Sequence, residues 1–195
     1  MTLKIIGATR SRTFRVLWLA EELGLDYQHV AEMPRSETVT KLNPLGQIPV
    51  LTDGDIVIPD SLAILHYLAD RADLFTHPAG TPERARMDAR INFVLTELEA
   101  PLWLAARHSF ILPPDRRHPE IKAWLKDDFR DAGEKFITLL GDAEYFAGDD
   151  FTIADIVAAH TIGWAITAKF EPTDALKTYL RRMTDRPAWA RAQAE

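Results

Sequence analysis

Two short pairs of residues carry the clearest chemical information in this sequence, Ile48-Pro49 and Asp60-Ser61. A proline in front of an apolar run donates no ladder hydrogen bond, so Pro49 belongs at a strand start or an edge. A cis bond there would turn the backbone of Ile48 outward, where an extended peptide can pair with it. At a helix start, Ser61 and unpaired N–H groups suit a carboxylate, and Asp60 suits an ammonium group. The pairs predict a site for a peptide with an amino acid head group. The simpler alternatives are a rigid turn at Pro49 and helix capping by Asp60-Ser61.

The elements that would position these pairs follow from the hydrophobic pattern. Apolar residues recur at helical spacing after Ser11, and Gly24 ends that helix. Two short apolar runs on either side of Asp53-Gly54 predict a hairpin. The predicted order is a strand at 3–7, a helix at 11–25, a strand at 26–30, a short irregular helix at 36–42, the hairpin and a helix at 61–71. This order looks like a thioredoxin-like domain, but the chain has no cysteine, so a thioredoxin redox function is excluded.

The rest of the chain shows helical patterns only. Residues 74–81, with His77-Pro78-Ala79-Gly80, break both periodicities and predict a linker. We therefore predict an α/β plus all-α architecture: a thioredoxin-like domain at 1–75, a linker at 76–81 and an all-helical bundle at 82–195. The segment Thr152-Ile153-Ala154-Asp155 is typical of a helix-capping motif and is interpreted as structural.

Composition excludes several classes of function. The chain has 195 residues, 47% of them hydrophobic, and a net charge of −6 with dispersed Lys and Arg. This charge argues against nucleic acid or an anionic membrane as a partner. No apolar run approaches the ~20 residues that span a bilayer, and no secretory signal is evident, so a soluble cytoplasmic protein is expected. Without cysteine, disulfides, thiolate nucleophiles and Cys-bound metals are excluded, and no other residues show metal-ligand spacing.

An ordered set of segments resembles the cytosolic glutathione S-transferases, in the bacterial Ser/Thr type rather than the Cys type. The set consists of the first strand, the helix SRTFRVLWLAEELGL, then LNPLGQIPVL, PDSLAILHYL and FTIADIVAA. It covers nearly the whole chain and implies the glutathione transferase fold. It also implies a detoxification enzyme that activates glutathione, its co-substrate, as a thiolate for attack on a hydrophobic electrophile. A homodimer without a metal is implied, and a glutathione peroxidase side activity is compatible with the resemblance.

The resemblance also assigns the glutathione-binding residues. Ser61 would bind the γ-glutamyl carboxylate, and Asp60 would contact its amine. Ile48, beside Pro49, would pair with the cysteinyl backbone. The glycyl carboxylate is assigned to Gln47 and Lys41, with a solvent-facing position as the alternative for both.

The donor that lowers the pKa of the glutathione thiol is expected between the first strand and the first helix, in the segment Ala8-Thr9-Arg10-Ser11-Arg12-Thr13. The usual serine position falls on Arg10, which departs from the family pattern. A one-residue adjustment of the loop makes Ser11 the donor, which we favour over Thr9 or Arg10. The alternative for Ser11 is an N-cap of the following helix.

The electrophile is expected between the domains, against the first long helix of the bundle. Trp103, Arg107, His108 and Phe110 form an aromatic and basic cluster there, with Trp164 as a further wall, and packing between helices is the alternative. The rival function is a non-catalytic binding or stress-response interaction protein that keeps the fold. The arginine at the serine position favours this rival, whereas retention of the head-group site opposes it.

Overall fold

The computed structural model describes residues 3–195, which form two compact units. The first unit contains the chain up to Thr81 together with Thr184–Glu195, and the second contains Pro82–Met183. The sequence prediction placed the whole of 82–195 in one helical domain, so the C-terminal segment lies in a different unit from the one expected. The physical reason is that its helix packs against the first helix of the chain, which a hydrophobic pattern alone does not reveal.

The first unit is built on a four-stranded sheet with the order β2-β1-β3-β4. The strands are β1 (Leu3–Ile6), β2 (Tyr27–Val30), β3 (Val50–Asp53) and β4 (Ile56–Pro59). Strand β1 pairs with β2 in parallel and with β3 antiparallel, and β3 and β4 form the predicted hairpin. Gly54, with a φ of 61°, supplies the left-handed backbone that this tight turn requires.

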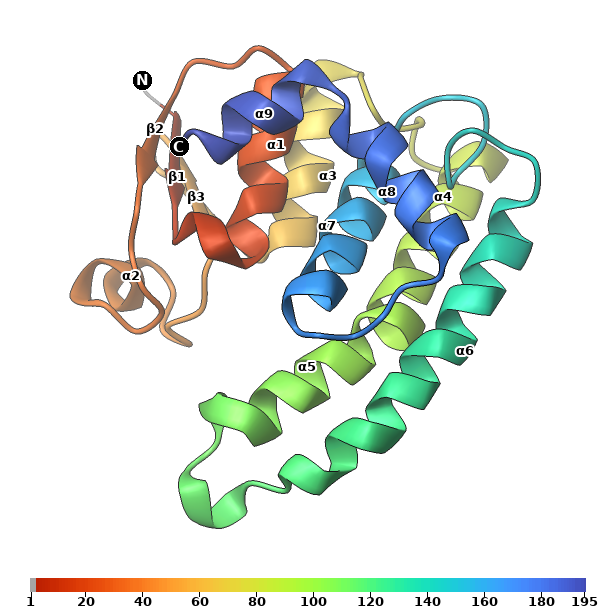
Figure 1. The fold of residues 1–195 in the computed structure, drawn as a ribbon. Coiled ribbons are helices and arrows are strands. Elements are labelled where there is room, and N and C mark those ends of the chain that lie inside the picture. Colours follow the sequence, from red (N-terminus) through yellow and green to blue (C-terminus); the bar gives the residue numbers. More distant parts are fainter. Residues whose placement is uncertain (1–2) are drawn as a thin grey trace. The chain divides into compact units, whose positions relative to one another are not determined.

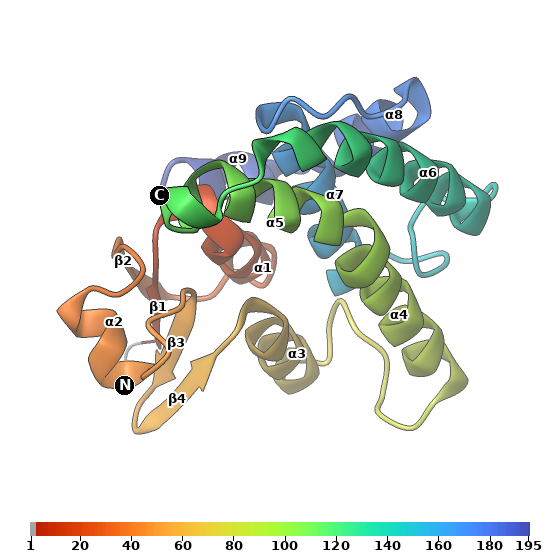
Figure 2. The same ribbon diagram turned by 90° about the horizontal axis from the view of Figure 1, so that it is seen from below.

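Helices cover both faces of this sheet. Helix α2 (Glu37–Leu42) lies on one face, where Val39 packs with Ile6 and Val50. Helices α1 (Phe14–Glu22) and α3 (Ser61–Ala72) lie on the other face, as Figures 1 and 2 show. The arrangement confirms the predicted thioredoxin-like domain.

Helix α1 begins at Phe14, three residues later than the pattern predicted. The preceding segment Thr9–Thr13 is irregular, because Ser11 has an extended backbone with φ −146° and ψ −171°, and Arg10 has φ −77° and ψ 42°. Apolar spacing is insensitive to such a distortion, since it reports only which residues share a face. The irregular segment is the one in which the thiol-activating donor is predicted.

The second unit is helical, as predicted. Its helices are α4 (Pro82–Phe93), α5 (Ala100–Ala106), α6 (Lys122–Leu140), α7 (Ile153–Thr167) and α8 (Asp174–Thr184), with π-helical turns at Val94–Leu98 and Arg107–Ile111 and 3₁₀ turns at Pro114–Arg116 and Pro119–Ile121. Helices α5 and α6 pack side by side, and the segment between them forms the end of this hairpin (Figure 1). No helix within residues 3–195 combines the length and the apolar character needed to cross a membrane.

A buried carboxylate organises the start of α7. Asp155 accepts hydrogen bonds from Phe146 N–H at 2.7 Å, Thr152 N–H at 2.9 Å and the Tyr179 hydroxyl at 2.7 Å. Thr152 caps the helix in return, so the predicted capping motif is confirmed. Burial raises the pKa of Asp155, while these donors act in the opposite direction. Burial also raises the pKa of Tyr179, which keeps its hydroxyl a donor.

Candidate functional site

The segment that enters β3 is shaped by a cis peptide bond between Ile48 and Pro49. Pro49 lies directly before β3, as expected for a strand start. Of the two positions expected for Pro49, the sheet edge is excluded, because β3 pairs with β1 on one side and β4 on the other. Ile48 lies outside this ladder, is half-buried, and forms no backbone hydrogen bond with any residue from 3 to 195. Its N–H and C=O are therefore available to an extended ligand.

Asn43 holds this segment in place, and the sequence reasoning missed it. Its side-chain Nδ2 donates to the carbonyl of Gln47 at 2.9 Å, and its Oδ1 accepts from Leu45 N–H at 3.1 Å. Asn43 is buried, so both bonds are shielded from water. An asparagine just after a helix and before a proline is the signal that points to such a turn.

Asp60 and Ser61 open α3, and they have different roles. Asp60 Oδ1 accepts from Leu62 N–H at 2.8 Å and Ala63 N–H at 3.1 Å, so it caps the helix. Asp60 also has a φ of 77°, a strained backbone for a residue other than glycine, and such strain is common at functional sites. Its Oδ2 takes no hydrogen bond within the described chain, which leaves it for an ammonium group.

Ser61 is a largely buried residue whose hydroxyl has no hydrogen-bond partner within residues 3–195. Only 3% of the residue is exposed. A hydroxyl without a protein partner at the start of a helix can donate its proton to a ligand. Because Ser61 is the first residue of α3, the helix dipole there favours an anion.

In the Thr9–Thr13 segment the Ser11 side chain is already engaged. Its Oγ lies 2.6 Å from the Ala8 carbonyl, to which it donates, and 2.9 Å from Thr13 Oγ1. It also accepts from Thr13 N–H at 3.1 Å, which matches the alternative interpretation of a capping residue. Thr9 is half-buried and Arg10 is exposed, and neither side chain forms a hydrogen bond within residues 3–195. All three donor candidates therefore lie on one irregular turn.

Gly7 brings this turn next to Ile48. A Cβ on Gly7 would overlap Thr13 Oγ1 and would come within 3.0 Å of the Ile48 Cβ, and its φ of 143° suits only glycine. Its N–H donates to Val30 at 3.0 Å and its carbonyl lies 2.8 Å from His29 Nε2. The predicted donor segment and the predicted peptide-binding segment are thus neighbours.

Lys41 and Gln47, the predicted partners of the glycyl carboxylate, are both exposed. Lys41 forms an ion pair with Glu37 at 2.7 Å, one turn earlier in α2. A surface pair of this kind is weak, so the Lys41 ammonium can exchange Glu37 for another carboxylate. Both predictions stay open.

The residues predicted to bind the electrophile lie in the second unit. Trp103 is on α5, while Arg107, His108 and Phe110 are on the π-helical turn that follows it, so these four share one end of the hairpin. His108 Nδ1 accepts from the backbone N–H of His118 at 3.1 Å, which places the proton of a neutral His108 ring on Nε2. Trp164 lies on α7 and is half-buried.

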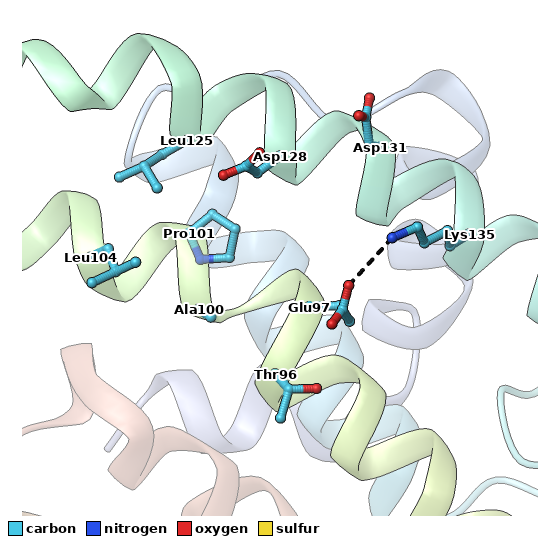
Figure 3. A pocket seen from close by; sticks show the side chains of 9 residues that line it. All are labelled: Thr96, Glu97, Ala100, Pro101, Leu104, Leu125, Asp128, Asp131 and Lys135. Carbon is cyan, nitrogen blue, oxygen red and sulfur yellow. Dashed lines mark hydrogen bonds and ion pairs between the residues drawn. The ribbon is translucent and has the colours of Figure 1, made fainter.

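A separate pocket of about 270 Å³ lies between α5 and α6 (Figure 3). Apolar side chains lie toward one end of the residues that line it and charged side chains toward the other, where Glu97 pairs with Lys135 at 3.4 Å. None of the predicted site residues lines it, and its carboxylates would repel an anionic ligand. The lining residues are Thr96, Glu97, Ala100, Pro101, Leu104, Leu125, Asp128, Asp131 and Lys135. Residues 3–195 contain no cluster of three or more metal-binding side chains.

Comparison with known protein families gives two matches. Residues 10–71 match the family described as glutathione S-transferase, N-terminal domain, and residues 125–191 match glutathione S-transferase, C-terminal domain. A zeta-class glutathione S-transferase of Euphorbia esula is 35% identical over 176 residues, which cover 85% of this chain and 76% of that protein. A glutathione S-transferase of Triticum aestivum is 33% identical over 150 residues, covering 73% and 68%.

Solved structures share the fold at lower identity. A glutathione transferase from Phanerochaete chrysosporium with oxidized glutathione superposes with a TM-score of 0.85 and 22% identity, over 99% of this chain and 94% of that one. A theta-class glutathione S-transferase from Xanthomonas axonopodis pv. citri with glutathione bound gives a TM-score of 0.79 and 24% identity, over 98% and 96%.

Proposed function

Because the chain belongs to the glutathione S-transferase family, we propose that it is a glutathione transferase whose co-substrate glutathione is anchored at Ser61 and along Ile48. The enzyme activates glutathione as a thiolate, which attacks a hydrophobic electrophile. The observation that carries the assignment is the Ser61 hydroxyl at the start of α3, which has no hydrogen-bond partner within residues 3–195 although the residue is only 3% exposed. It provides a donor for the γ-glutamyl carboxylate, and Asp60 Oδ2 lies on the preceding residue for the amine.

The rest of the tripeptide extends along the segment before β3. The cysteinyl backbone pairs with the N–H and C=O of Ile48, in the manner of an added strand. The side-chain sulfur then faces the Thr9–Thr13 turn, which Gly7 holds next to Ile48. The glycyl carboxylate is left to Lys41 and Gln47.

Thiol activation requires a hydrogen-bond donor to the sulfur, because a bond to the thiolate lowers the pKa of the thiol. Ser11 is the preferred donor, and its hydroxyl proton must turn from the Ala8 carbonyl to the sulfur. Thr9 and Arg10 on the same turn are the alternatives. The thiol loses its proton to solvent before attack, and the donor stabilises the resulting thiolate. The thiolate sulfur then forms a bond to carbon of the electrophile, and in an aryl substitution the displaced group leaves as an anion.

We assign the electrophile to the aromatic and basic cluster of the second unit. Trp103 and Phe110 offer apolar faces, and Arg107 and the Nε2–H of His108 offer donors for polar substituents on the electrophile. Trp164 is a further wall. We also propose a cytoplasmic homodimer with isologous contacts.

A second candidate, glutathione binding without turnover, is favoured by one observation: the Ser11 proton is already bonded to a carbonyl. Both candidates are tested by calorimetric titration of glutathione into the wild type, Ser61→Ala and a matched control, Ser109→Ala in the helical unit. A hydrogen bond to a charged group contributes ~1.5–3 kcal/mol, so Ser61→Ala should weaken binding by about 10- to 150-fold. Ser109→Ala should bind like the wild type.

Turnover is then measured with 1-chloro-2,4-dinitrobenzene, a general aryl electrophile. Binding with turnover supports the transferase, whereas binding without turnover on this and other electrophiles supports the second candidate. A wild type that does not bind glutathione, or a Ser61→Ala variant that binds equally well, contradicts the proposed anchor.

A further inference from the structure

The C-terminal helix α9 (Pro187–Gln193) lies along α1 in the first unit (Figure 1). The Trp189 ring packs edge-on against Phe14, with 4.6 Å between ring centroids, and against Trp18, with 4.7 Å. Phe14 and Trp18 are both buried. Such edge-to-face pairs are more favourable than their buried area alone provides, so Trp189 fixes the orientation of the first turns of α1.

A largely buried ion pair holds α9 to the other end of α1. Arg186 donates from Nε to Glu22 Oε1 at 2.6 Å and from Nη2 to Glu22 Oε2 at 2.8 Å, in a bidentate arrangement. Glu22 Oε1 also accepts from Trp18 Nε1 at 2.9 Å. The Glu22 side chain is only 8% exposed, so salt screens this pair little.

A second arginine ties the same end of α1 to α9, and its partner Glu21 also bonds to the sheet. Arg191 donates from Nε to Glu21 Oε2 at 2.6 Å and from Nη2 to the Glu21 carbonyl at 3.0 Å. The Tyr27 hydroxyl, on β2, donates to Glu21 Oε1 at 2.9 Å. Helix α9 is therefore joined to the first turns of α1 by aromatic packing and to the last turn of α1 by two arginines.

The aromatic contact reaches the donor segment through the backbone. Phe14 is the residue that follows Thr9–Thr13, and its N–H donates to the carbonyl of Ser11. The Ser11 hydroxyl in turn accepts from Thr13 N–H. A shift of the Phe14 ring would therefore move both the carbonyl and the hydroxyl of Ser11.

We propose that Trp189 and Arg186 are positioning residues of the glutathione reaction, which hold α1 so that the donor of the Thr9–Thr13 turn meets the glutathione sulfur. The proposal rests on the function proposed above, because it presupposes a thiol to activate. Misplacement of a catalytic group by ~1 Å can cost about 100-fold in rate, so a contact outside the site can control the chemistry. Glutathione anchoring by Ser61, at the start of α3, does not use these contacts.

The test compares Trp189→Ala, Trp189→Phe and Arg186→Gln with the wild type. Trp124→Ala, on α6, is the matched control because that tryptophan is 71% exposed. The readouts are the pH profile of kcat/KM, the Kd of glutathione and Tm. We expect Trp189→Ala and Arg186→Gln to move the acidic limb of the profile to higher pH by about one unit. This shift corresponds to about a tenfold lower fraction of glutathione thiolate at a pH below the pKa of the thiol.

The Kd of glutathione should stay within twofold of the wild-type value, Trp189→Phe should recover most of the profile, and Trp124→Ala should match the wild type. If Tm falls while the pH profile and kcat of folded Trp189→Ala stay unchanged, α9 is only structural and the proposal is overturned. Should Trp189→Ala not fold, Arg186→Gln decides the question in the same way, because it leaves the aromatic packing in place. A wild type without glutathione binding instead refutes the proposed function itself.

Discussion

Replacement of Asp155 by alanine should cost the helical unit a large part of its stability. The carboxylate accepts three short bonds, from Phe146 N–H, Thr152 N–H and the Tyr179 hydroxyl, at a site with no solvent exposure. Each buried donor left without a partner costs ~1–3 kcal/mol, and three such donors give about 4–6 kcal/mol when partial relaxation is allowed. Whole domains are stable by only ~5–15 kcal/mol, so the variant should be close to unfolding.

The assay is urea unfolding followed by far-UV circular dichroism, with a Tm scan in parallel. Tyr179→Phe removes one of the three short bonds and leaves both backbone donors in place, so it should cost about 1–2 kcal/mol. Asp131→Ala, an exposed aspartate on α6, is the matched control and should change stability by no more than ~0.5 kcal/mol. A loss in Asp155→Ala no greater than that in Asp131→Ala would refute the assignment of Asp155 as the organising acceptor.

Two further predictions concern the donor turn and the pH dependence of stability. Ser11→Ala should lower kcat by ~10- to 1000-fold with little change in the Kd of glutathione, by analogy with removal of an oxyanion donor. An unchanged kcat would transfer the role to another donor of the same turn. Hydrogen bonds from Tyr67 and Arg71 lower the pKa of Asp53, so this carboxyl binds a proton less readily in the folded state than in the unfolded chain. Its stabilisation is present above the ordinary carboxyl pKa of ~4 and is lost as the pH falls through the lowered value. Asp53→Asn should therefore narrow the fall in Tm between pH 5 and pH 2, and an unaltered difference in Tm over this range would contradict this.

The helices and strands of each unit were predictable from the sequence because apolar residues repeat with a different period in helices and in strands. Strand pairs around Asp53-Gly54 and the capping segment at Thr152–Asp155 are local signals, and both are confirmed. The partner of α9 was not accessible in this way. An amphipathic pattern shows which face of a helix is buried but not what buries it, and the Trp189 contacts join residues from opposite ends of the chain.

A residue of the candidate site was predictable from the sequence where its type suits one particular position in the fold for a clear chemical reason. A proline before an apolar strand and a serine at a helix start are such cases, and both lie where expected. Asn43 and Gly7 were missed as site residues because their effect depends on the close approach of loops that are distant in sequence. Spacing along the chain carries no information about that approach.

Whether Ser11 can donate to the glutathione sulfur depends on where its hydroxyl proton lies in the Thr9–Thr13 turn. The Ser11 hydroxyl has one proton, and at 2.6 Å the Ala8 carbonyl holds it more closely than Thr13 Oγ1 does at 2.9 Å. A thiolate is a charged acceptor and forms a stronger bond than a neutral carbonyl, so it can draw this proton away when glutathione binds. Thr13 then compensates for the bond that Ala8 loses. Its N–H stays bonded to the Ser11 oxygen, its hydroxyl can turn to donate to the same oxygen, and both bonds favour donation by Ser11. Ser11 can therefore cap the turn in the free protein and activate the thiol in the complex, so its two predicted roles are compatible.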